Sequence, residues 1–276
     1  MHYIFLLGAD DPEMKAMAQL LIVFGAPFLY SSVEGGRTTP GNSYRADPID
    51  VPDAQQLVVV ECAFEDMPGS TIVIDHHRPG DPGFALGPDQ FWEASSIGQL
   101  HALLGIEPDH DALVMAAFDH CFATAVRGGC TGVTAEEVIH LRIGEIAKQT
   151  RTSGDAVWKC VTGFRSAFTR APDIMIGKQP VKDMRGEHLG VGYSLEYLSA
   201  QLAVVMNGGV ALFRHKDHKR QAEKNTLTGH ATPATVKFFM EKWAVAQGLV
   251  RVFGVPERGY AGGFVPRRRI SSARTA

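Results

Sequence analysis

The chain has 276 residues, of which 45% are hydrophobic and 21% are charged, so an ordinary globular protein with two modest domains is expected. A formal net charge of −3 argues against a protein that coats nucleic acid through bulk positive charge, although a local basic patch stays open. The four cysteines form no Cys-x-x-Cys pair, and a chain of this size needs no disulfides, which favours a reducing cytoplasm. No basic segment precedes the first apolar run, and Gln19, Gly25 and Pro27 interrupt the next, so neither a signal peptide nor a membrane span is expected.

The first element is a short apolar strand over residues 3–7, and an acidic turn follows it. Asp10, Asp11 and Glu13 lie around Pro12, which suits the first position of a helix. Acidic residues often cap helices and balance the helix dipole. Three carboxyl groups within four positions exceed what capping requires, so the turn is a candidate ligand site.

Two further strands each end in residues that carry chemistry. The apolar run 57–60 stops at Glu61, and the β-branched run 71–74 stops at a polar group. In an open α/β sheet, ligands bind at the carboxyl ends of the strands. Carboxylate and imidazole ligands beside an arginine are typical of a metal site that handles phosphate; the group comprises Asp75, His76, His77 and Arg78. Taken alone, the triplet is more simply explained as a solvated loop with a chance histidine pair.

Two helices follow the triplet. The segment 94–100 begins with small residues, Ser95 and Ser96, whose hydroxyl groups and free amides allow an anion to approach. The segment 111–125 is apolar, yet Asp119 and His120 lie within it. Buried polar groups need partners, so this pair is expected to join the other acids.

The second half of the chain has fewer signals. Helices are expected over 134–148 and 155–168, a linker rich in Pro, Gly, Lys and Asp over 171–189, a helix over 193–206 and a strand over 209–213. A basic segment then runs from Arg214 to Lys224, and Gly229-His230 precedes another helix. Together they could form a phosphate funnel with Arg214 as a bidentate donor, or the basic segment could be a solvated helical face.

The order of these features resembles the DHH phosphoesterase superfamily. The acidic turn, Glu61, Asp75-His76-His77, the Ser-Ser helix and Asp119 match its motifs in order over residues 4–126. The run 208–233, with Arg214 and Gly229-His230, is similar to the DHH-associated domain that accompanies them. The resemblance implies an α/β protein with a parallel-sheet metal-binding domain (1–170), a linker (171–189) and a smaller α/β substrate-capture domain with a basic tail (190–276).

The resemblance also implies a site. Two Mn²⁺ ions are expected, with Mg²⁺ or Co²⁺ also compatible, and they would activate a water for attack on a phosphodiester. The implied metal ligands are Asp11, Glu13, Glu61, Asp75, His76 and Asp119; the implied catalytic residues are His77 and Asp75; the implied substrate-binding residues are Arg78, Arg214, Gly229 and His230. The expected substrate is a short single-stranded oligonucleotide or a small phosphorylated nucleotide, and a homodimer is left open.

The chain departs from the family pattern at four points. Leu7 stands where the family has a histidine, Glu13 and Glu61 replace aspartates, and Leu227-Thr228 replace glycines. A longer side chain displaces its carboxylate by about an ångström, which can cost about 100-fold in rate. The alternative is therefore a catalytically impaired nucleotide- or RNA-binding module on the same scaffold. A third reading, an unrelated hydrolase with an accidental triplet, predicts that Asp11, Glu61 and Asp75 lie far apart.

Overall fold

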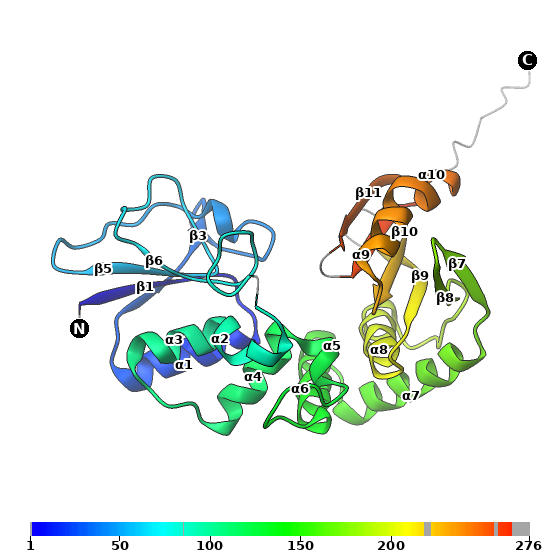
Figure 1. The fold of residues 1–276 in the computed structure, drawn as a ribbon, viewed down its shortest axis with the longest axis horizontal. Coiled ribbons are helices and arrows are strands. Elements are labelled where there is room, and N and C mark those ends of the chain that lie inside the picture. The colour runs from blue at the N-terminus through cyan, green and yellow to red at the C-terminus, as the bar shows by residue number, and fades with distance from the viewer. Residues whose placement is uncertain (1, 85, 218–221, 257–258, 267–276) are drawn as a thin grey trace, which may run out of the picture. The chain divides into compact units, whose positions relative to one another are not determined.

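The computed structural model describes residues 2–84, 86–217, 222–256 and 259–266. It divides into two compact units, Met1–Leu141 and Arg142–Ala276 (Figure 1). Each unit combines helices with its own sheet, so the expected α/β class is confirmed. None of the described helices has the length and apolar character that crossing a bilayer requires. All four cysteines are free and buried.

The first unit contains a parallel sheet of four strands in the order β2-β1-β5-β6. Its strands are β1 Tyr3–Leu7, β2 Phe28–Tyr30, β5 Gln56–Val60 and β6 Ile72–Ile74. Figure 1 shows helices gathered on one face: α1 Pro12–Phe24, α2 Phe91–Ala94, α3 Ser96–Leu104 and α4 His110–His120. The other face packs on loop residues, including Ala46 and Phe64. Shorter elements are β3 Ser32–Val33, β4 Gly36–Arg37, η1 Ser43–Arg45, η2 Pro88–Gln90 and α5 Phe122–Ala125.

The register of this sheet aligns the ends of three strands. Leu7 is paired with Val60, and Val60 is paired with Ile74. The strands read as continuous apolar runs because both faces of the sheet are covered. The residues that follow them, Gly8, Glu61 and Asp75, therefore leave the sheet at one edge. A Cβ atom at Gly8 would lie 2.5 Å from the Glu61 carbonyl oxygen, so only glycine fits there.

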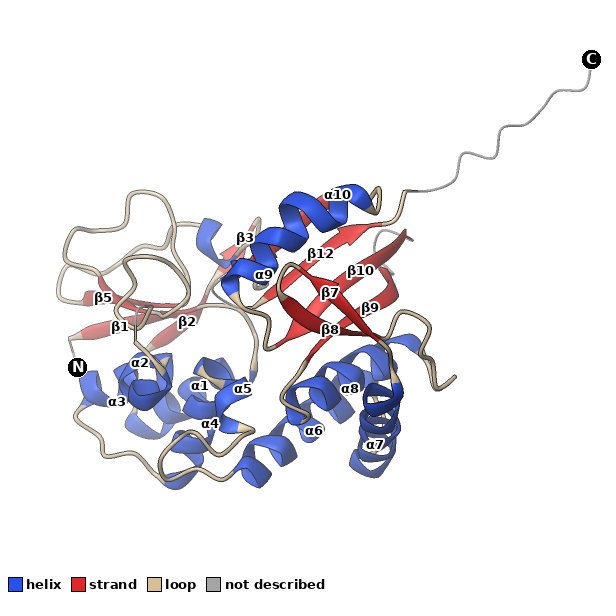
Figure 2. Ribbon diagram, turned by 45° about the vertical axis from the view of Figure 1, so that its right-hand side comes forward, coloured by secondary structure: helices blue, strands red, loops and turns tan. Residues whose placement is uncertain are grey.

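The second unit contains a six-stranded mixed sheet in the order β11-β12-β10-β9-β8-β7. Its strands are β7 Asp173–Ile176, β8 Gln179–Asp183, β9 Val210–Asp217, β10 Ala222–Gly229, β11 Val250–Val255 and β12 Tyr260–Phe264. Figure 2 shows α7 Gly154–Arg170 and α8 Tyr193–Met206 on one side of this sheet. The other side carries α9 Pro233–Phe238, the π-helix η3 Phe239–Trp243 and α10 Ala244–Ala246. Helix α6, Ala135–Thr150, runs across the division between the units.

The division corrects the expected linker. Residues 142–170 belong to the second unit, where α7 packs on α8. Residues 171–189 include β7 and β8, which form a hairpin closed by Gly177-Lys178. The polar residues in this segment predict a linker, but exposed edge strands carry the same residue types. The pattern of Pro, Gly, Lys and Asp thus fits an edge hairpin, with Gly177 at a φ of 64°.

The basic segment is not a helical face either. Its described cations, Arg214, Lys216 and Lys224, lie on the antiparallel strands β9 and β10. The tail after residue 266, together with Lys219 and Arg220, lies outside the described residues.

The glycine at the sheet edge gives a direct test of this packing. Gly8→Ala should lower the free energy of unfolding by about 1–3 kcal/mol, because the new methyl group overpacks against rigid backbone. It should also weaken divalent-metal binding, since Glu61 has to move. Urea denaturation and metal titration measure the two effects. Gly69→Ala is the control, because a Cβ atom there meets nothing within 4 Å. Equal stability of the two variants would contradict the tight approach at Gly8.

Candidate metal centre

Four residues from three segments place ligand atoms around one point. Glu61 follows β5, His76 and His77 follow β6, and Asp119 lies in the last turn of α4. One ligand atom from each lies within 4.8 Å of all the others. Asp11 is close enough to Glu61 for its pKa to respond to that charge. If the Asp-His-His triplet were accidental, Asp11, Glu61 and Asp75 would lie far apart; that prediction is therefore wrong.

The ring of His76 directs one nitrogen at two acids. Its Nε2 lies 3.0 Å from Asp119 Oδ2 and 3.5 Å from Glu61 Oε1. This nitrogen is buried, and despite these short distances it has no partner in hydrogen-bond geometry among the described residues. Two ligands that each lie about 2.1 Å from an ion and subtend a right angle are separated by about 3 Å. The spacing of the three side chains therefore suits coordination of a shared cation.

His120 explains which nitrogen of His76 is available. His120 Nε2 lies 3.2 Å from the Leu86 carbonyl oxygen, which can only accept, so Nε2 carries a hydrogen. In a neutral ring the other nitrogen, Nδ1, then accepts, and it lies 2.9 Å from His76 Nδ1. His76 must donate from Nδ1, which leaves the lone pair on Nε2 facing the two acids. Metal-bound histidines are commonly fixed in this way by a partner on the remote nitrogen.

Without an ion, a proton takes the place of the cation. Burial lowers the pKa of His76, but the close carboxylates of Asp119 and Glu61 outweigh it and raise the pKa to about 9. The pKa of Asp119 moves the opposite way: burial raises it, and His76 and His77 together lower it further than burial lifts it. The cluster thus holds positive charge at the position where three ligand atoms converge.

Asp75 lies next to the histidines, and both of its carboxylate oxygens accept hydrogen bonds. Its Oδ1 accepts from the backbone amides of His76 and His77 at 2.7 and 3.0 Å, and from His77 Nδ1 at 2.9 Å. Its Oδ2 accepts from the Tyr44 hydroxyl at 2.8 Å. Asp75 is 1% exposed, and although burial raises its pKa, these donors lower it overall. A carboxylate with four donors is suited to orient His77 more than to bind a metal ion.

The acidic turn supplies two more carboxyl groups. Asp11 is the N-cap of α1 and accepts from the Met14 amide at 2.8 Å. Its pKa is raised to about 7 by burial first and then by the charge of Glu61. Glu13 is 1% exposed, and burial, Asp119 and Glu61 hold its pKa well above the usual range. Its Oε2 is buried and has no hydrogen-bond partner in the part of the chain that the structure describes.

The start of α3 holds two of these acids. Ser96 Oγ donates to Glu61 Oε1 at 2.7 Å, and the Ile97 amide donates to Glu13 Oε1 at 2.9 Å. The helix N-terminus was expected to receive an anion, and the anions it receives are side chains of the protein itself. Glu61 also has a φ of 50°, a conformation that costs a non-glycine residue free energy and that clusters at functional sites.

The donor set fits a divalent metal. Hard carboxylate oxygens with imidazole nitrogen suit Mn²⁺, Mg²⁺ or Co²⁺, and the unsatisfied atoms of His76 and Glu13 both lie in this buried cluster. Burial of several carboxyl groups together is costly unless protons or cations compensate their charge. Leu7, where the resemblance led us to look for a histidine, is fully buried in β1 and offers no ligand.

Of the expected substrate-binding residues, only Arg78 belongs to the unit that contains this cluster. Arg78 is exposed and lies over the Tyr44 ring. Arg214, Gly229 and His230 belong to the second unit. There Arg214 pairs with Asn225 and Gly229 pairs with Val210, so the two positions are about 13 Å apart along the strands. Gly229 has a structural role as well, because a Cβ atom would collide with the Gly209 carbonyl oxygen.

Sequence patterns had only partly indicated the supporting residues. His120 was noticeable as a polar residue in an apolar helix, but its bond to His76 could not be foreseen. Tyr44 lies in η1, in a segment of weak pattern, and nothing in the sequence connects it with Asp75.

Comparisons with known proteins add little beyond this geometry. No family model matches the chain, and no curated protein matches it. Among solved structures, it resembles a pGpG-specific phosphodiesterase, PggH from Vibrio cholerae, with 11% sequence identity and a TM-score of 0.40. The match covers 96% of this chain and 94% of that chain. A likeness at this level does not identify a function, so we base the proposal below on the contacts of the cluster.

His120 can be tested through the atom that it presents to His76. His120→Leu should weaken divalent-metal binding by about 10- to 100-fold, the usual cost of losing such a partner. His120→Asn should lose less, because an amide oxygen can still accept from His76 Nδ1. Isothermal titration with Mn²⁺ measures both, and His140→Leu, at an exposed histidine, is the control. Wild-type affinity in the leucine variant would contradict the role of His120.

Proposed function

We propose that this chain is a metal-dependent phosphoesterase that hydrolyses a phosphodiester in a short oligonucleotide or a small phosphorylated nucleotide. The observation that supports it best is the position of His76 Nε2, a buried atom that faces Asp119 and Glu61 at the carboxyl edge of a parallel sheet. The resemblance of the motif order to the DHH superfamily points to the same chemistry.

The proposed ligand set has two parts. Glu61, His76 and Asp119 would hold one ion, and Asp11 and Glu13 would hold a second with Glu61 shared between them. Mn²⁺ is the proposed ion, with Mg²⁺ or Co²⁺ as substitutes. When bound, such ions supply positive charge that polarises a phosphate and makes a water more acidic. The raised pKa values of Asp11 and Glu13, caused first by burial and then by neighbouring carboxylates, support a cation at this part of the cluster.

His77 and Asp75 are proposed as the catalytic pair. Because His77 Nδ1 donates to Asp75 at 2.9 Å, a neutral ring has its lone pair on Nε2. His77 is partly exposed, so that nitrogen can exchange a proton with a phosphate oxygen or a water. Asp75 would hold the ring in this tautomer and stabilise its charged form, while the Tyr44 hydroxyl keeps Asp75 in place.

The competing proposal is a nucleotide- or RNA-binding module with impaired turnover. Its support is specific: Leu7 offers no ligand, and the Asp11 carboxylate is already bonded to the Met14 amide as a helix cap. Both features weaken the binding of the second metal ion more than the binding of the first. A module of this kind would bind one ion and a nucleotide without releasing product.

The two proposals are separated by a charge-only substitution. Glu61→Gln keeps the shape and the contact with Ser96 but removes one negative charge, so Mn²⁺-dependent cleavage of a dinucleotide should fall about 100-fold or more. Glu65→Gln, at an exposed position nearby, is the control. Metal content and product release are the measurements; a wild-type protein that binds Mn²⁺ but releases no mononucleotide would favour the binding module.

Asp75 is distinguished from a metal ligand by comparing metal content with turnover. Asp75→Asn should lower kcat by about 100-fold or more while leaving the bound Mn²⁺ nearly unchanged, because Asp75 acts through His77. If Asp75 were a ligand, the metal content would fall in parallel with activity. Steady-state kinetics and elemental analysis of the same preparation give the answer.

A further inference from the structure

Arg37 stands at the same sheet edge as the acidic cluster, although no sequence motif gave it a role. It ends β4, which follows β2 as part of the short β3–β4 hairpin. Its Nη1 donates to the Leu7 carbonyl oxygen at 3.3 Å. Leu7 ends β1 and is paired with Val60, the residue before Glu61. Because neighbouring strands lie about 4.8 Å apart, the guanidinium group lies close to the strand end that Glu61 follows.

Two contacts hold this guanidinium group in place. Besides the bond to the Leu7 carbonyl, Arg37 Cζ lies 3.7 Å from the centroid of the Tyr30 ring, in the strand paired with β1. The hairpin is fastened to the end of β2 by a buried hydrogen bond of 2.6 Å between the Ser31 and Thr38 hydroxyl groups. A planar guanidinium that already rests on an aromatic ring loses less side-chain entropy when it binds an anion. Arg37 is thus exposed and preorganised.

The neighbouring acids do not use the charge of Arg37. Burial lowers its pKa overall, although the nearby charges of Tyr30, Asp10 and Asp11 act in the opposite direction. Asp10 forms its ion pair with Lys15, at 3.5 Å. Arg37 forms no ion pair in the part of the chain that the structure describes. Its remaining N–H groups are therefore available to an anion.

A phosphate drawn to the metal centre needs partners beyond the ions. The N-terminus of a helix often supplies them, but the first turn of α3 already donates to Glu61 and Glu13. The ions would neutralise the oxygens that face the carboxylates, and the other oxygens of the phosphate stay negatively charged. Arg37 supplies a positive charge at this edge of the sheet, beside the acidic turn that follows Leu7.

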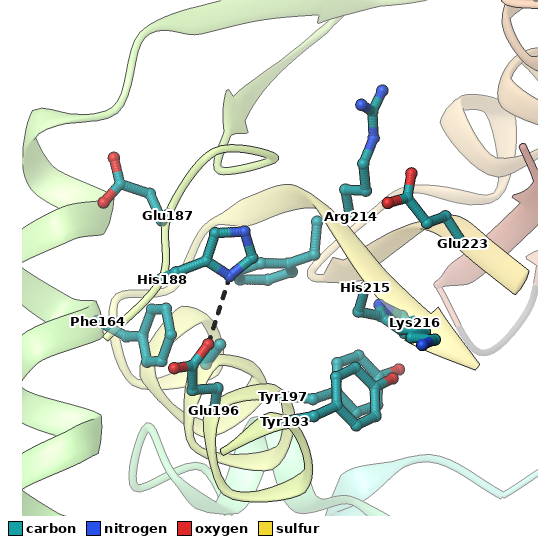
Figure 3. A pocket seen from close by; sticks show the side chains of 12 residues that line it. Phe164, Glu187, His188, Tyr193, Glu196, Tyr197, Arg214, His215, Lys216 and Glu223 are labelled. Carbon is teal, nitrogen blue, oxygen red and sulfur yellow. Dashed lines mark hydrogen bonds and ion pairs between the residues drawn. The ribbon is translucent and has the colours of Figure 1, made fainter. Parts of the chain in front are cut away.

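A different set of cations lies in the second unit, where Arg214 and Lys216 line a cavity of about 280 Å³ (Figure 3). Arg214 is the residue that the resemblance implies for substrate capture. Arg37 belongs to the first unit, as do Glu61 and the other acids of the cluster. Its position beside them therefore does not depend on how the two units are placed.

We propose that Arg37 binds a phosphate group of the substrate beside the metal ions. The inference rests on the proposed function, because a bound cation is what draws an anion to so acidic an edge. It adds a contact from β4, which none of the matched motifs contains. A guanidinium group can donate to two oxygens of one phosphate, so Arg37 would fix the orientation of the phosphate as well as balance its charge. The scissile phosphodiester and a terminal phosphate of the same substrate both offer these oxygens.

The test is Arg37→Gln in the full chain, with two titrations. Inorganic phosphate added to the Mn²⁺-saturated variant should bind about tenfold more weakly than to the wild type, since a charged hydrogen bond is lost. Mn²⁺ alone should bind the variant as tightly as the wild type or more tightly, because a neighbouring positive charge is removed. Damage to the fold of this edge would instead weaken the binding of both ligands. Arg37→Lys, which keeps the charge, should recover part of the phosphate affinity.

Arg127→Gln, at an exposed arginine of the same unit, is the matched control and should leave both affinities unchanged. The phosphate that Arg37 binds is identified from KM values for a dinucleotide that carries or lacks a 5′-phosphate. A KM raised in Arg37→Gln for both dinucleotides assigns Arg37 to the scissile phosphodiester. A KM raised for the phosphorylated dinucleotide alone assigns it to the terminal phosphate.

Failure of this inference differs from failure of the proposed function. Three results overturn the role of Arg37 even if the wild type hydrolyses a dinucleotide: wild-type phosphate affinity in Arg37→Gln, equal losses of phosphate and Mn²⁺ binding, or no phosphate binding by the Mn²⁺-loaded wild type at millimolar concentration. A wild type that releases no mononucleotide, while Arg37→Gln still weakens phosphate binding and spares Mn²⁺ binding, overturns the hydrolysis alone.

Discussion

Repulsion among buried carboxyl groups is the constraint on which the first unit depends. The register of β1, β5 and β6 brings the acidic turn, Glu61 and the Asp75 triplet to one edge, and α4 adds Asp119. Each ionised carboxylate that leaves water costs several kcal/mol unless it is compensated. Protonation of His76 and the raised pKa of Asp11 are the compensations that the protein itself provides. A bound cation would compensate the same charges more completely.

The backbone contributes to this compensation. The first turn of α3 donates to Glu61 and Glu13 through the Ser96 hydroxyl and the Ile97 amide. The positive end of the helix dipole favours these negative groups. Close packing makes the arrangement rigid: a Cβ atom at Gly98, in the same turn, would collide with the Trp92 carbonyl oxygen. The helix start is therefore fixed between α2 and the acids, and it sets where two of the proposed ligands lie.

The sequence predicted the elements of the first unit well because their patterns are local. The strand over 3–7, the helix from Pro12 and the polar group after residue 74 follow from apolar periodicity and turn residues. The expected linker was wrong because an exposed edge hairpin, with Gly177-Lys178 at its turn, has the composition of a linker. The separation of Arg214 from Gly229 depended on the length and register of β9 and β10, which residue spacing does not determine. Tyr44 contacts Asp75 and His120 contacts His76 across long stretches of the sequence, so local residue patterns do not predict these contacts.

The hydrogen bond from His120 to the Leu86 carbonyl has a consequence for the whole cluster. If that oxygen moved away, the His120 proton could shift to the other ring nitrogen, and His76 would then turn an N–H group towards Asp119. The affinity of the proposed centre for cations would thus depend on a main-chain atom, which no side-chain replacement can delete. In the proposed metal centre, the position of the Leu86 carbonyl would therefore influence metal loading from outside the coordination sphere, without contributing a ligand.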